Sequence, residues 1–72
     1  MTLAALIRSL RARLDLTQAE LAEHLACSVR TLQLYESGAQ SPGSAMLAEL
    51  ARVAGVAIQV DARGWRVLEL AA

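Results

Sequence analysis

The sequence is poor in residues that support catalysis, metal binding or cross-linking. Among 72 residues it has one cysteine, one histidine and no phenylalanine. A lone Cys27 cannot form an intrachain disulfide, and with a lone His24 it cannot complete a zinc site. We interpret Cys27 as a half-buried core residue, with a redox switch as the alternative. The sequence also lacks a carboxylate pair, a nucleophile motif and a glycine-rich phosphate loop, so we expect no enzymatic activity, cofactor or metal.

Long apolar runs are absent as well. A transmembrane helix needs about 20 consecutive apolar residues, and no segment of the sequence has them. Residues 1–14 lack acidic side chains, as a transit peptide or a membrane-surface helix would, but their apolar residues recur at helical spacing and favour a core helix. We therefore expect no membrane partner.

The residues that are abundant are small and apolar. The chain is 56% hydrophobic and rich in alanine and leucine. Such a composition favours a helical core of small volume, and 72 residues make one domain of only marginal core size. Some apolar surface is therefore expected to be buried against a second copy.

Two helices are predicted in the first 25 residues. Thr2 is positioned to cap the first, and Thr17 with Glu20 forms a capping box for the second, because the hydroxyl and the carboxylate each satisfy one orphan backbone donor. The inward stripe of the first helix is Leu3, Leu6, Ile7, Leu10 and Leu14, and that of the second is Leu21, Ala22 and Leu25.

Two further helices follow. Ser28 is a good N-cap for a helix from Val29 to Ser37, and Gly38 suits its left-handed end. After Pro42 a fourth helix is predicted near Ser44 to Ala54, and Gly55 stops it. Its predicted buried side is Met46, Leu47, Leu50, Val53 and Ala54.

The third helix separates its polar and apolar side chains. At about 100° per residue, Leu32 and Tyr35 point inward. Arg30, Gln33, Leu34 and Ser37 fall on the far side. Arginine pairs bidentately with guanine and glutamine with adenine. Leu34 on this face is either a contact for a thymine methyl or an ordinary surface leucine.

The periodicity changes after Gly55. Residues 56–60 and 65–70 alternate between apolar and polar, and residues 61–64 suit a type I turn with Gly64 left-handed. This pattern predicts a C-terminal β-hairpin. The expected fold is mainly α, with four helices over residues 1–55 followed by a hairpin over residues 56–72, in one compact domain.

The segment LTQAELAEHLACSVRTLQLYESG, residues 16–38, resembles the Cro and phage-repressor family of helix-turn-helix domains, also called Xre-like. The resemblance extends over roughly residues 3–56 and includes Ser41 and Pro42. It implies DNA binding, with Gln18 and Ser37 at the phosphate backbone and Ser28, Val29, Arg30, Gln33 and Leu34 at bases. Arg13 is a further candidate for a phosphate contact. It also implies a partly buried salt bridge between Arg11 and Glu36, which we assign to structure.

Several residues depart from the family pattern. Ala26 replaces the turn glycine, which is strained if φ is positive there, and Val29 replaces a polar residue. The loop from Ala39 to Ser41 lacks the basic residues of relatives, and seven arginines balance seven acidic residues. We therefore expect weak non-specific DNA binding and dependence on dimerisation, with backbone amides near Gln18 and Val29 holding phosphates.

The hairpin allows two interpretations because an isolated hairpin is unstable in water. It either folds back on its own helices, or it pairs with the hairpin of a second subunit with Trp65 near the centre of the joined sheet. We expect the second, since a two-fold dimer places two recognition helices about 34 Å apart. The predicted interface residues are Val56, Ile58, Val60, Trp65 and Val67.

These observations predict a small dimeric repressor that recognises an inverted repeat in double-stranded DNA. We expect a cytoplasmic protein, prokaryotic or phage-encoded, of a phage, plasmid or autoregulatory operon. The alternative is a helix-turn-helix protein whose partner is another protein, either an antitoxin bound to its toxin or an adaptor that has lost DNA binding.

Overall fold

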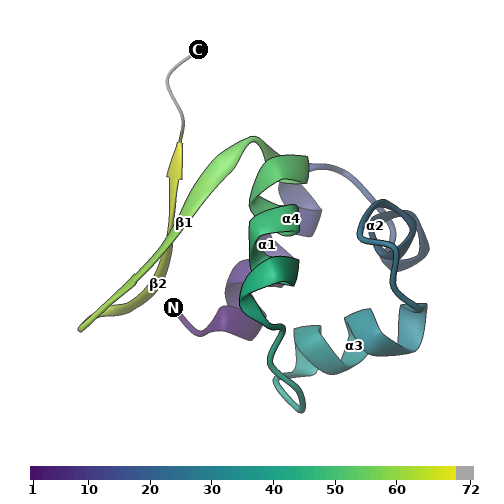
Figure 1. Ribbon diagram of the computed structural model, residues 1–72, viewed down its shortest axis with the longest axis horizontal. Helices are drawn as coiled ribbons and strands as arrows, with labels where there is room; N and C mark the ends of the chain where they lie inside the picture. Colours follow the sequence, from purple (N-terminus) through teal and green to yellow (C-terminus); the bar gives the residue numbers. More distant parts are fainter. Residues whose placement is uncertain (70–72) are drawn as a thin grey trace.

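The computed structural model describes residues 1–69, which form four helices and one antiparallel hairpin (Figure 1). The elements are α1 (Leu3–Arg13), α2 (Gln18–His24), α3 (Val29–Ser37), α4 (Ser44–Ala54), β1 (Val56–Asp61) and β2 (Gly64–Glu69). The predicted fold class is confirmed. Leu70, the last residue of the predicted second strand, and residues 71–72 lie outside the described residues. Within residues 1–69, none of the helices has the length and apolar character that a membrane crossing requires.

Side-chain caps fix where the first three helices begin. The Thr2 hydroxyl accepts a hydrogen bond from the Ala5 N–H, and the Ser28 hydroxyl accepts one from the Thr31 N–H. At α2 the capping box is complete, because the Glu20 N–H donates to Thr17 Oγ1 at 3.1 Å and the Thr17 N–H donates to Glu20 Oε1 at 2.9 Å. All three predicted N-caps are confirmed.

The helices α1 and α2 end in the same left-handed turn. Asp15 and Ala26 both have φ of +54°, so Ala26 has the positive φ at which alanine is expected to be strained, whereas the positive φ of Asp15 was not anticipated. The N–H of Leu16 donates to the Arg11 carbonyl and the N–H of Cys27 donates to the Ala22 carbonyl, which is the Schellman pattern. Helices α3 and α4 end at Gly38 and Gly55, as predicted.

The core lies where α1, α2 and α3 meet, and α4 and β1 close it. Leu14 and Leu47, predicted to face inward, are only half-buried and lie outside this core. The core residues are Leu6, Ile7, Leu10, Leu21, Ala22, Leu25, Leu32, Tyr35, Leu50 and Val56.

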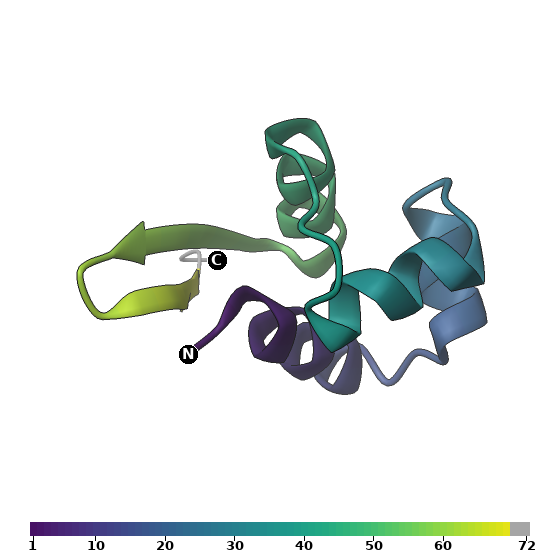
Figure 2. The ribbon, with the colours of Figure 1, turned by 90° about the horizontal axis from the view of Figure 1, so that it is seen from below.

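The hairpin extends from α4 on the side of the molecule opposite α2 (Figures 1 and 2). Asp61 pairs with Gly64 across a two-residue turn, and Gly64 has a φ of +102°. A Cβ at Gly64 would lie 2.9 Å from the Met1 carbonyl oxygen, so this close approach also requires glycine. That carbonyl accepts a hydrogen bond from the Trp65 N–H at 3.0 Å and ties the start of β2 to residue 1.

Candidate nucleic-acid interface

Helix α3 lies along the periphery, and its sequence determines which side is exposed (Figure 1). Leu32 and Tyr35 are buried in the core, as predicted. The predicted base-contacting residues Ser28, Val29, Arg30 and Gln33 are exposed, Val29 to 38%, and Leu34 is half-buried. The helix therefore presents its N-terminal half and one polar side to the surroundings.

Leu34 and Ser37 help to close the turn after α3. The Gln40 N–H donates to the Leu34 carbonyl at 3.2 Å, so the chain folds back over the end of the helix. The Ser37 hydroxyl donates to the same carbonyl at 3.1 Å and accepts from the Ala39 N–H at 3.3 Å. A phosphate contact by Ser37 would therefore share the hydroxyl with this local cap.

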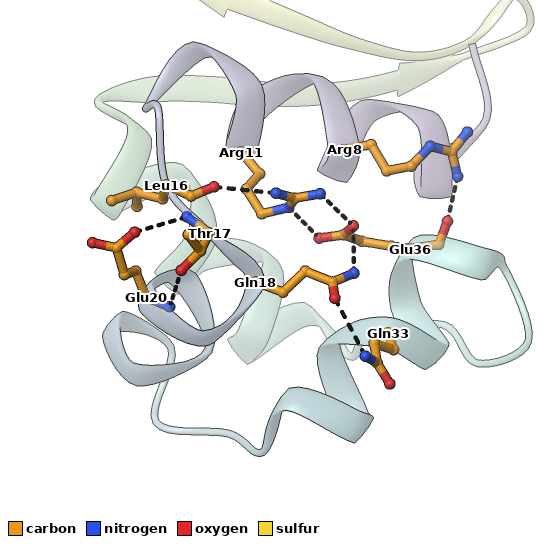
Figure 3. A network of polar contacts seen from close by, with 8 residues as sticks. All are labelled: Arg8, Arg11, Leu16, Thr17, Gln18, Glu20, Gln33 and Glu36. Atoms are coloured by element: carbon orange, nitrogen blue, oxygen red, sulfur yellow. Dashed lines mark hydrogen bonds and ion pairs between the residues drawn. The ribbon is translucent and has the colours of Figure 1, made fainter.

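A partly buried ion pair fastens α3 to α1 (Figure 3). Arg11 Nε lies 2.8 Å from Glu36 Oε2, and Arg11 Nη2 lies 3.2 Å from Glu36 Oε1. Glu36 is only 5% exposed, while Arg11 also donates to the Leu16 carbonyl at 3.1 Å. Arg8 donates to the backbone carbonyl of Glu36. A partly buried, bidentate pair with a second contact to the same helix end sets the orientation of α3 more than it adds stability.

Two glutamines extend this ion pair to the surface (Figure 3). Gln18 Nε2 donates to Glu36 Oε1 at 3.2 Å, and Gln33 Nε2 donates to Gln18 Oε1 at 3.3 Å. The predicted phosphate contact Gln18 is thus linked to the predicted base contact Gln33. This link was not predicted from the sequence, although Gln33 and Glu36 are three residues apart and therefore neighbours on one helix face.

Most arginines already have partners within residues 1–69. Arg13, predicted to contact phosphate, forms an ion pair with Glu69 of β2, and both side chains are exposed. Other intrachain partners hold Arg8, Arg11, Arg52 and Arg66. In this part of the chain only Arg30 and Arg63 lack a side-chain hydrogen bond or ion pair. Arg30 is therefore the basic side chain that α3 offers to a ligand.

Cys27 and His24 lie beside the turn between α2 and α3. Cys27 packs against the core, and burial raises the pKa of its thiol, which disfavours the reactive thiolate. His24 is exposed at the end of α2. Residues 1–69 contain no group of three or more histidine, cysteine or acidic side chains placed to hold a metal ion.

The residues predicted at a dimer interface lie mainly against the chain's own helices. Val56 is buried in the core, and three others are half-buried against it: Ile58, Trp65 and Val67. Val60, near the tip, is 56% exposed. On the other face of the hairpin Arg66 bonds to Gln59 and pairs with Asp61.

Comparison with known proteins identifies the family of the chain. No curated protein and no solved structure matches the chain. A family described as "Helix-turn-helix domain" matches residues 2–71, nearly the whole length. That description fits the two short helices and the exposed α3 of the structure. The chain therefore belongs to the helix-turn-helix domain family, a family that implies DNA as partner and is typically non-enzymatic.

Proposed function

We propose that the protein is a dimeric transcriptional repressor that places α3 in the DNA major groove at each half of an inverted repeat. The observation that carries this proposal is the exposure of Arg30 and Gln33 on a helix whose back is held by Leu32, Tyr35 and Glu36. Base reading requires polar side chains on a rigid element. The ordering of a mobile element on binding would cost conformational entropy and so reduce the binding free energy.

Arg30 supplies the strongest base contact in this proposal. Its guanidinium has no partner among residues 1–69, so DNA binding does not have to break an existing ion pair. Arginine matches the two acceptors of guanine, N7 and O6. The exposed side chains of Val29 and Ser28 lie one and two residues before it, and valine suits a thymine methyl.

Phosphate contacts come from few charges. The proposed contacts are Gln18, Ser37, Arg13 and the first backbone N–H groups of α3. Backbone N–H groups at the start of a helix bind anions without carrying a formal charge. The Arg13 pair with Glu69 is largely exposed, and such pairs contribute about 0–1 kcal/mol, so a phosphate can replace it at little cost.

Dimerisation is proposed to use the outer edge of β1. The backbone N–H of Trp65 donates to the Met1 carbonyl, so this N–H points away from β1. In an antiparallel ladder, the backbone N–H and C=O groups of the partner residue Val60 then point away from β2. The same alternation turns the backbone groups of Ile58 and Val56 outward. Within residues 1–69, those groups of β1 make no hydrogen bond, and a second β1 across a two-fold axis satisfies them. Trp65 then lies one strand away from the centre of the joined sheet, whereas the sequence led us to expect it near that centre.

The test is a titration of duplex DNA, selected from a randomised library by the wild-type protein, measured by fluorescence anisotropy. Arg30→Ala is expected to weaken binding to the selected duplex by about 1–3 kcal/mol, with an unchanged melting temperature. Arg63→Ala removes an equally unpartnered arginine at the hairpin tip and is expected to leave specific binding intact. Binding without sequence preference, or equal losses in the two variants, would contradict the proposal.

A second candidate function is an antitoxin or an adaptor that binds another protein. The zero net charge and the loop from Ala39 to Ser41, which has no basic residue, favour it, because DNA-binding domains are typically basic. Failure to select any duplex, together with a stoichiometric complex with the product of the adjacent gene, would favour this function over the repressor.

A further inference from the structure

We propose that the buried Glu36 acts through Gln18 to fix the amide of Gln33, so that Gln33 presents its oxygen outward and selects adenine. This inference rests on the proposed function, since it assigns a base preference to α3 in the major groove. It makes Gln18 and Glu36 positioning residues for specificity, in addition to any contact that Gln18 makes with phosphate.

The orientation begins at the carboxylate of Glu36. Its two oxygens accept from Arg11 at 2.8 and 3.2 Å, and the residue is only 5% exposed. A carboxylate paired with a guanidinium can accept hydrogen bonds but cannot donate them. The amide of Gln18 therefore turns its Nε2 toward Glu36 Oε1, at 3.2 Å. The reversed amide would place two acceptor oxygens against each other at a partly buried site.

The constraint then passes to Gln33. Once Gln18 directs its nitrogen at Glu36, its Oε1 faces α3 and requires a donor. Gln33 Nε2 provides one at 3.3 Å, which turns the Gln33 oxygen away from the protein (Figure 3). A glutamine without such a partner rotates between both amide orientations, because its terminal torsion is broad and roughly two-fold. The chain of acceptors and donors removes that ambiguity.

An outward oxygen discriminates between purines. Adenine exposes a donor at N6 beside an acceptor at N7, whereas guanine exposes two acceptors, O6 and N7. The Gln33 amide keeps its oxygen and one N–H free, which is the combination that adenine matches. Opposite guanine the same oxygen would meet an acceptor. The network thus converts a residue with two possible orientations into an adenine reader.

The experiment separates orientation from phosphate binding by two substitutions at position 18. Gln18→Leu removes the hydrogen bond to Glu36 and the hydrogen bond from Gln33. Gln18→Lys keeps a donor for Glu36 and a positive charge for phosphate, but it offers Gln33 only donors. The Gln33 oxygen is then expected to turn inward and its NH2 group outward, toward the acceptors of guanine. Gln40→Lys adds the same charge in the exposed loop after α3 and serves as the matched control.

Preferences are measured with the randomised duplex library and then with single-base variants of the selected duplex. The position read by Gln33 is the one whose preference disappears in Gln33→Ala. At that position Gln18→Leu is expected to lower the ratio of adenine to guanine affinity about 5- to 10-fold, which corresponds to one net hydrogen bond. Gln18→Lys is expected to shift it further toward guanine, while Gln40→Lys leaves the ratio unchanged. Thermal melting verifies that each variant is folded.

The outcomes are distinguishable. A wild-type protein that selects no duplex overturns both the proposed function and this inference. A protein that selects a duplex, but whose adenine preference at the Gln33 position is the same in both Gln18 variants, overturns the inference alone. Loss of preference at every position in Gln18→Leu also overturns it, because a general loss indicates that α3 itself has moved.

Discussion

The two halves of the molecule differ in how completely they satisfy their own interactions. In the helical half, Glu36 is 5% exposed and its carboxylate is held by Arg11 and Gln18, and Leu32 is fully buried behind α3. The hairpin residues Glu69 and Arg66 form their ion pairs, with Arg13 of α1 and with Asp61, at the surface, and β1 keeps an outer edge without partners among residues 1–69. The difference agrees with the proposed function, in which the helices present α3 to DNA and the hairpin pairs with a second copy.

The largest expected effect concerns the Arg11–Glu36 ion pair of the helical half, compared with the Arg13–Glu69 ion pair that joins α1 to the hairpin. Arg11→Met leaves the buried Glu36 carboxylate without its cation, and we expect the free energy of unfolding to fall by about 3–5 kcal/mol. Arg13→Met breaks the exposed pair with Glu69 and is expected to cost about 0–1 kcal/mol. Urea denaturation followed by circular dichroism measures both. Equal losses would contradict the contrast between a buried platform and a surface-held hairpin.

The next effect concerns the free edge of β1. Val60→Pro removes a backbone N–H that points away from β2, so the intrachain ladder is kept while the outer edge loses a donor. We expect the dimer dissociation constant to rise at least about tenfold, or about 1.4 kcal/mol, in analytical ultracentrifugation. Gln59→Pro is the control, because its N–H lies within the ladder and its loss should disrupt the hairpin itself. An unchanged dimer in Val60→Pro would exclude the β1 edge as the interface.

A smaller effect is expected in the turn that joins α2 to α3. Ala26→Gly relieves an alanine at a φ of +54°, and we expect stabilisation of up to about 1 kcal/mol. Ala19→Gly, within α2, has no such strain to relieve and should destabilise by about 1 kcal/mol. Thermal denaturation compares the two variants. Destabilisation by Ala26→Gly would show that the left-handed turn is not a source of strain.

The smallest effect is a pH dependence at the start of α2. Hydrogen bonds from the backbone and side chain of Thr17 lower the pKa of Glu20 below its usual 4.5. A lowered pKa means that this contribution to stability is present above about pH 4.5 and is lost as the pH falls through the lowered value. Glu20→Gln keeps the capping geometry without a titrating group. Its melting temperature should therefore fall less between pH 6 and pH 3, and an identical fall would contradict the assignment.

The predictability of each feature follows from how local its cause is. The boundaries of α3 were predictable because Ser28 and Gly38 act on the backbone within one turn. The amide chain from Glu36 to Gln33 was not, since it depends on how α2 packs against α3. The ion pair between Arg13 and Glu69 was not predictable either, because Glu69 lies on an element far along the chain. Likewise, alternation in β1 indicated an apolar face for Val56 and Ile58 but not which surface covers it.

We propose above that α3 is the surface that enters the DNA groove. The most direct test is to titrate the isotopically labelled protein with its selected duplex and follow the backbone amide chemical shifts. If α3 enters the groove, the largest shifts are expected at residues 28–34 and at Gln18, with small shifts at the hairpin tip around Arg63. Large shifts confined to the hairpin, with residues 28–34 unaffected, would contradict it.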